Sequence, residues 1–115
     1  MEQQRPDAVL VSGEGDLYAH VKLIVKLAEK NGFPTIGSYR EHVEAGGLMA
    51  YGFDLAALAR RIADDTDQIL KGAKPGDIPI YQSTTFELQI NLKTAKALGF
   101  TVPPTLLARA EEVIE

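Results

Sequence analysis

The chain has 115 residues, of which 45% are apolar and 24% charged, so it can bury the core of one domain and is not disordered by composition. Twelve basic and sixteen acidic residues give a net charge of -4, so we expect no nucleic-acid partner. Cysteine is absent, which excludes disulfide frameworks, thiolate metal sites and cysteine nucleophiles.

The two ends of the chain lack targeting features. The opening MEQQRPDAVLV has no basic region followed by a long apolar run, so we expect no signal peptide, and the apolar runs are too short for a transmembrane helix. A strand-like run begins almost at once, and the chain ends inside an amphipathic pattern. We expect a single domain over residues 1–115 that is a piece of a longer protein.

The first predicted element is a strand over Asp7–Ser12, whose unbroken apolar run is typical of a strand covered on both faces. A turn with two glycines follows. Asp16 is the predicted N-cap of a helix that runs to about Asn31, because apolar residues recur there with a 3.6-residue period. Gly32 stands where a left-handed residue ends a helix.

The middle of the chain continues this alternation. We expect short strands at Thr35–Gly37 and Leu48–Tyr51, with a short helix over Arg40–Ala45 between them. Asp54 is the predicted cap of the strongest helix, which ends at Gly72. Its apolar stripe consists of Leu55, Leu58, Ala59, Ile62, Thr66, Ile69 and Leu70.

The last third of the chain is predicted to hold two strands and two helices. After a turn at Lys74–Asp77, the strands are expected at Ile78–Tyr81 and Glu87–Ile90. The first helix covers Leu92–Leu98, with Asn91 as its cap and Gly99 at its end, and the second runs from Thr105 to about Ile114. The alternation of strands and helices predicts an α/β fold with a mainly parallel sheet flanked by helices. The strand order stays open.

Three loops follow the carboxyl ends of predicted strands, where open α/β sheets bind ligands. They are Ser12–Gly15, Ser38–Arg40 and Tyr51–Phe53, and they offer hydroxyls, backbone N–H groups, both charges and aromatic rings. This set suits a small polar ligand with an apolar part. The same residues also form ordinary turns, and the aromatic rings at 39, 51 and 53 fit a sheet edge equally well.

The sequence disfavours a phosphate-binding loop, a catalytic nucleophile and a metal site. The SGEGD loop lacks the third glycine of a dinucleotide loop and the GK[ST] of a phosphate loop. Ser12 lies in no nucleophile elbow, and His20 and His42 have no partner at metal-ligand spacing. Glu14 and Asp16 could form a carboxylate pair, but capping is the simpler role for Asp16. We therefore expect no catalytic residue, no metal and no cofactor.

Four motifs carry a family resemblance that covers about Asp7 to Glu115. They are EAGGLMAYGFDL, ILKGAKPGDIP, FELQINLKTAKALG and PPTLLARAEEVIE. Together they resemble the C-terminal part of the substrate-binding proteins of bacterial ABC transporters, in the group that includes tryptophan/tyrosine-type solute-binding lipoproteins.

The resemblance implies a type I periplasmic-binding fold, in which two Rossmann-like lobes joined by crossing strands close over a ligand. This chain would then be the C-terminal portion, without the N-terminal lobe. It further implies a non-enzymatic component of an ABC importer that is periplasmic or extracytoplasmic in the full-length protein. The implied partners are a small organic solute, such as an amino acid or a related carboxylate, and an ABC permease.

The resemblance also implies a set of ligand-binding residues. Ser12, Gly13 and Glu14 match a segment that commonly faces the cleft, and Ser38-Tyr39 matches a serine followed by a polar residue. Tyr39 departs from the acid that some members carry. Tyr51 matches the crossing strand near the hinge. In this assignment Glu14 takes a cation or donor, the serines take a carboxylate, and the tyrosines take the apolar body.

The helix Asp54–Lys71 corresponds to one that usually packs on the other lobe. Without that lobe each large side chain of its stripe forgoes on the order of 1.5–3 kcal/mol of burial. We expect the helix either to fold back onto its own sheet or to be buried in a homodimer. The alternatives for the whole chain are a small self-contained flavodoxin-like enzyme or regulatory domain, and a structural interaction domain.

Overall fold

The computed structural model describes residues 5–115, and it confirms an α/β fold with a mainly parallel sheet. Five strands lie in the order β1-β2-β3-β4-β5. The first three are parallel to one another and the last two are parallel to each other, while β3 and β4 pair antiparallel. The strands are β1 (Val9–Leu10), β2 (Thr35–Gly37), β3 (Met49–Gly52), β4 (Glu87–Asn91) and β5 (Glu112–Ile114).

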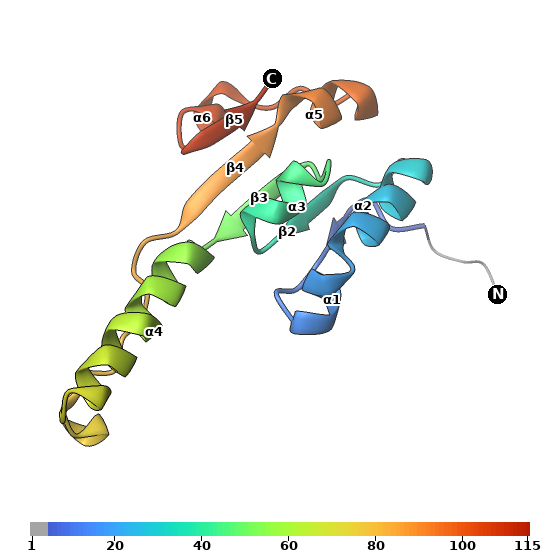
Figure 1. Ribbon diagram of the computed structural model, residues 1–115. Helices are drawn as coiled ribbons and strands as arrows, with labels where there is room; N and C mark the ends of the chain where they lie inside the picture. Colours follow the sequence, from blue (N-terminus) through green and yellow to red (C-terminus); the bar gives the residue numbers. More distant parts are fainter. Residues whose placement is uncertain (1–4) are drawn as a thin grey trace.

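The connections between strands hold the helices (Figure 1). They are α1 (Gly15–Ala19), α2 (Val21–Lys30), α3 (Arg40–Glu44), α4 (Leu55–Leu70), the 3-10 turn η1 (Pro75–Asp77), α5 (Leu92–Leu98) and α6 (Pro104–Leu107). The core is small and lies where β3, β4 and α3 meet. Its most deeply buried side chains are Ile90 of β4, Val43 of α3 and Ala50 of β3.

Asn91 explains why the motif INLK folds as a strand followed at once by a helix. Its side-chain oxygen accepts from the Thr94 N–H at 3.1 Å and caps α5, as predicted. Its side-chain nitrogen donates to the carbonyl of Val43 at 3.3 Å, and the Thr94 hydroxyl donates to the carbonyl of Gly46 at 2.8 Å. These bonds fasten α5 to the segment that joins α3 to β3.

The predicted first helix is broken at His20, and Asp16 is not its cap. The helix begins at Gly15, with Glu14 in the capping position, so Asp16 lies in the first turn. His20 leaves helical geometry at φ -108 and ψ 14, and its ring Nδ1 donates to the carbonyl of Asp16 at 2.8 Å. The side chain thus competes with the backbone ladder and separates α1 from α2.

The predicted helix over Thr105–Ile114 is wrong beyond Leu107. The chain instead turns into β5, which pairs Glu112, Val113 and Ile114 with the three last residues of β4. The periodicity of the sequence could not predict this strand. It forms because β4 offers an unpaired edge, and that edge exists only in the folded sheet.

The predicted strand Ile78–Tyr81 is also wrong. Ile80 is 99% exposed, and the segment pairs with no strand. It runs beside α4, where the Arg61 guanidinium lies 5.4 Å from the centre of the Tyr81 ring. The strands β2, β3 and β4 begin and end within one residue of their predicted bounds, while β1 is shorter than predicted, at two residues.

The longest helix projects away from the sheet (Figure 1). We call α4 and the returning residues 71–86 the arm. Asp54 caps α4 as predicted, through a hydrogen bond from the Ala56 N–H at 2.8 Å. No residue of α4 is buried, so the helix does not fold back onto its own sheet. The radius of gyration is 17.8 Å, whereas a compact domain of this length has about 13 Å.

Candidate functional site

A cavity of about 400 Å³ lies where the arm joins the sheet. We call it the junction cavity. It is formed by the loop between β2 and α3, the loop between β3 and α4, the first turns of α4, and β4. Its lining residues are Ser38, Tyr39, Arg40, Glu41, Gly52, Phe53, Asp54, Leu55, Ala56, Arg60, Glu87 and Gln89.

The backbone at Gly52 shapes this cavity. A Cβ atom at Gly52 would overlap the carbonyl oxygen of Ser38, so only glycine lets the ends of β2 and β3 approach this closely. The antiparallel register then places Glu87 opposite Gly52 and Gln89 opposite Ala50. Two polar residues of β4 therefore line a cavity whose other walls are loops.

Three aromatic rings follow one another from α1 to the start of α4. Tyr18 and Tyr39 meet edge to face, with ring centres 5.5 Å apart, and Tyr39 and Phe53 do the same at 5.7 Å. The Tyr39 hydroxyl donates to the carbonyl of Gly13 at 3.2 Å. All three loops that follow the parallel strands are thus joined through Tyr39.

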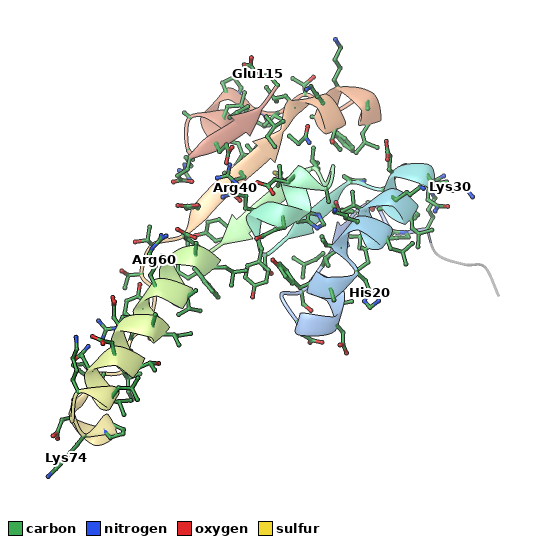
Figure 2. The ribbon with its side chains drawn as sticks, viewed as in Figure 1. His20, Lys30, Arg40, Arg60, Lys74 and Glu115 are labelled. Atoms are coloured by element: carbon green, nitrogen blue, oxygen red, sulfur yellow. The ribbon has the colours of Figure 1, made fainter. Side chains whose placement is uncertain are left out.

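Both signs of charge are present around the junction cavity. Arg40 forms ion pairs with Glu44 at 2.8 Å and Glu112 at 2.7 Å, and these carboxylates raise its pKa. Arg60 lies 3.6 Å from Asp54 near the sheet end of α4, while Lys74 marks the far tip of the arm (Figure 2). Both arginines of the lining are thus held by carboxylates of the chain itself.

Glu41 affects the ionisation of Tyr18, the first of these three aromatic residues. Its carboxylate raises the pKa of the Tyr18 phenol above its ordinary value, as a hydrogen-bond acceptor first and as a negative charge second. Glu41 thus favours the protonated form of the Tyr18 phenol.

The structure brings four of the six predicted ligand-binding residues together. Ser38 and Tyr39 line the junction cavity, and Ser12 joins them at a second, much smaller cavity of about 10 Å³. Gly13 is tied to Tyr39 by the hydrogen bond above. Glu14 is exposed at the start of α1, and Tyr51 is 56% exposed and stacks on Phe86, so both lie outside these two cavities.

Several lining residues were not predicted. Tyr18 and Arg60 lie about one turn inside helices, and the helical pattern alone marks them as ordinary surface residues. Glu87 and Gln89 reach the site only because β4 pairs with β3, and that pairing could not be read from the sequence. Phe53 was foreseen as an aromatic of the third loop. Within residues 5–115, no group of three metal-ligating side chains occurs.

A family comparison decides the classification of the chain. The model of the family described as "ABC transporter substrate binding protein" matches residues 3–114. The chain belongs to this family. Members are substrate-binding proteins, as the four sequence motifs indicated.

Individual relatives agree with this assignment. The chain is 29% identical over 92 residues to the tyrosine-binding protein of Clostridioides difficile strain R20291, a match that covers 80% of this chain and 27% of that protein. It is 32% identical, with a TM-score of 0.88, to the solved ABC domain from Streptococcus pneumoniae in complex with L-Trp, and the match covers 96% of this chain and 37% of that one.

A third relative extends the likeness to another genus. A conserved domain protein of Vibrio cholerae O1 biovar El Tor strain N16961 has a TM-score of 0.87 and 27% identity, over 93% of this chain and 36% of that one. The chain therefore spans between about a quarter and two fifths of the length of these relatives. Within residues 5–115, no helix is long and apolar enough to cross a membrane.

Proposed function

We propose that this chain supplies one lobe and the hinge of a two-lobe solute-binding protein that serves an ABC importer. Its ligand would be an amino acid with an aromatic side chain, bound between the lobes. The observation that carries the proposal is the junction cavity, which combines arginine and carboxylate side chains with the edge-to-face rings of Tyr39 and Phe53.

The chemistry of the cavity fits such a ligand. An α-amino acid carries an ammonium and a carboxylate, which match the acidic and basic side chains of the lining. Tyr39 and Phe53 offer aromatic faces and edges to its side chain. The resemblance assigns the carboxylate to the hydroxyls of Ser12 and Ser38 and to backbone N–H groups; Ser38 lines the junction cavity beside the arginines, whereas Ser12 lines only the smaller cavity. Glu14 and Tyr51, outside the two cavities, stay as ligand-binding predictions from the resemblance.

The ligands of the relatives support the same class. One relative is named for tyrosine, and another was solved with L-Trp. Both relatives are much longer than the matched segment, which covers 27% of one and 37% of the other. We propose that the other half of the cleft comes from a second lobe that this chain does not contain.

The arm supports the two-lobe arrangement. The chain exposes 8554 Å² of surface, whereas a compact monomer of its mass exposes about 6,200 Å². Large apolar side chains of the arm contribute to this excess area. They include Ile62, Leu70 and Ile80, which are 58%, 82% and 99% exposed. We propose that the second lobe covers them, so that the arm is structurally part of that lobe.

The connections between the arm and the sheet are suited to act as a hinge. The chain leaves the sheet after Gly52 and returns before Glu87, and these two residues are paired neighbours in the sheet. Tyr51 and Phe86 stack beside this point at 5.7 Å. Rotation about two adjacent connections would close the lobes over the ligand without disturbing either core.

The remaining parts of the proposal concern the whole protein. We infer a non-enzymatic role, an extracytoplasmic location and delivery of the solute to an ABC permease. A homodimer through the helix Asp54–Lys71 is the competing explanation for the exposed arm, and it makes a different prediction for the mass in solution.

Calorimetric titration of the intact protein with L-tryptophan and L-tyrosine tests the ligand class. We expect saturable binding of at least one of them, and substitution Phe53→Ala to weaken it about tenfold or more, because the ring loses contact area with the ligand. Tyr81→Ala, which removes an aromatic ring from the arm away from the cavity, is the matched control. Absence of binding to both amino acids would refute the proposed ligand class.

A further inference from the structure

The carboxylates that line the junction cavity differ in the partners that hold them. They are Glu41, Asp54 and Glu87. Asp54 caps α4 and lies 3.6 Å from the guanidinium of Arg60. Glu41 is the acceptor for the phenol of Tyr18. Glu87 forms no ion pair within residues 5–115, so its charge is the one in the lining that has neither a cation nor a helix cap beside it.

The place of Glu87 in the sheet explains why it has no cation. Its cross-strand neighbour on β3 is Gly52, which has no side chain to pair with it. Two residues along β4, and therefore on the same face, lies Gln89. This side chain is 5% exposed, and its Nε2 donates to Oε2 of Glu87 at 3.1 Å. A neutral amide orients a carboxylate but leaves its charge uncompensated.

The nearest arginine of the lining is occupied elsewhere. Arg40 donates from Nε to Glu44 at 2.8 Å and from Nη2 to Glu112 at 2.7 Å. Glu44 and Glu112 are the main causes that raise the pKa of Arg40, and Glu87 contributes least. Among residues 5–115, no cation is therefore placed to bind Glu87, and its carboxylate is available to a ligand in the cavity.

We propose that Glu87 binds the ammonium group of the solute, and that Gln89 is a positioning residue which holds the Glu87 carboxylate at the cavity wall. The inference rests on the proposed function, which supplies an α-amino acid as the ligand. A charge-assisted hydrogen bond from ammonium to carboxylate is stronger than a neutral one. The resemblance gives this role to Glu14, but Glu14 is exposed and lies outside both cavities described above.

Ligands that lack one charged group test the assignment. Tryptamine keeps the ring and the ammonium of L-tryptophan, whereas indole-3-propionate keeps the ring and the carboxylate. In calorimetric titrations of the intact protein, we expect Glu87→Gln to weaken binding of L-tryptophan and tryptamine about tenfold or more. Indole-3-propionate should bind the variant as well as the wild type or better, because the variant removes a repulsion between two carboxylates. Its retained binding also shows that the variant is folded.

Two further variants separate binding from charge and structure. Glu29→Gln removes one negative charge from an exposed position on α2 outside the junction cavity, so it should leave all three affinities within about twofold. Gln89→Leu removes the group that holds Glu87. It should weaken L-tryptophan and tryptamine, by less than Glu87→Gln does, and spare indole-3-propionate. A merely structural role of Gln89 would weaken all three ligands alike.

The possible outcomes distinguish this inference from the proposed function. If Glu87→Gln binds L-tryptophan like the wild type, or weakens indole-3-propionate equally, Glu87 does not bind the ammonium, although the ligand class stands. If the wild type binds tryptamine through Glu87 but neither L-tryptophan nor L-tyrosine, the ligand class fails and the ammonium site stands. If it binds none of these compounds, both fail. Should L-tyrosine bind more tightly, tyramine and 3-(4-hydroxyphenyl)propionate replace the indole compounds.

Discussion

At the scale of single residues, the junction cavity depends on the approach of Gly52 to the Ser38 carbonyl. We expect Gly52→Ala to push these segments apart, destabilise the protein by about 1–3 kcal/mol and weaken ligand binding. Urea unfolding and ligand titration measure the two effects. Gly76→Ala is the control, because a Cβ there meets no atom within 4 Å. If Gly52→Ala has the stability of the wild-type protein, the close approach of Gly52 to the Ser38 carbonyl does not require glycine.

His42 gives a second residue-scale prediction, on pH. Burial lowers its folded-state pKa below the unfolded value of about 6.5, so the unfolded chain takes up the proton first. Its contribution to stability is therefore complete above about pH 6.5 and is lost as the pH falls toward the folded-state pKa. We expect the free energy of unfolding, measured by urea from pH 8 to 5, to fall less steeply in His42→Gln. Identical slopes would contradict this.

At the scale of elements, the Asn91 side chain connects β4, α5 and α3. Asn91→Ala removes both the α5 cap and the bond to Val43, and we expect a loss of about 1–3 kcal/mol in the free energy of unfolding. Asn91→Ser keeps a capping oxygen and should recover part of that loss. Equal destabilisation by the two variants would mean that the cap contributes nothing.

The arm makes the second prediction at this scale. Because α4 buries no residue, its backbone hydrogen bonds are protected only by local helix formation, which is weak in water. In the 115-residue chain we expect amides 55–70 to exchange with deuterium much faster than those of β4, as measured by mass spectrometry. Slow exchange throughout α4 in a monomer would mean that the helix is packed against the sheet after all.

Helices and strands that depend on local interactions could be predicted from the sequence, and those that depend on distant segments could not. Periodicity and caps located α4, and the Asn91 and Gly99 signals bounded α5, because these depend on local interactions. The end of the chain read as a helix, since nothing in LLARAEEVIE reports that β4 offers an open edge. The candidate site divides in the same way: loop residues such as Ser38 and Tyr39 were found, while Glu87 arrives through an antiparallel pairing between distant segments.

At the scale of the whole molecule, the elongated shape separates the two explanations for the exposed arm. If a second lobe normally covers it, the 115-residue chain alone is a monomer at dilute concentration, with an apolar arm in solvent. If the arm is a dimer interface, the mass doubles. Sedimentation velocity at micromolar concentration distinguishes the two, and we expect the monomer. A stable dimer that Leu58→Asp dissociates would support the homodimer instead.

The most direct test of the central claim is a paired calorimetric titration with L-tryptophan and L-tyrosine. One sample is the 115-residue chain, and the other is the intact protein that contains both proposed lobes. We predict saturable binding by the intact protein and no saturation of the 115-residue chain up to about 1 mM, because half of a cleft leaves most of the ligand in water. Micromolar binding by the 115-residue chain alone would contradict the account.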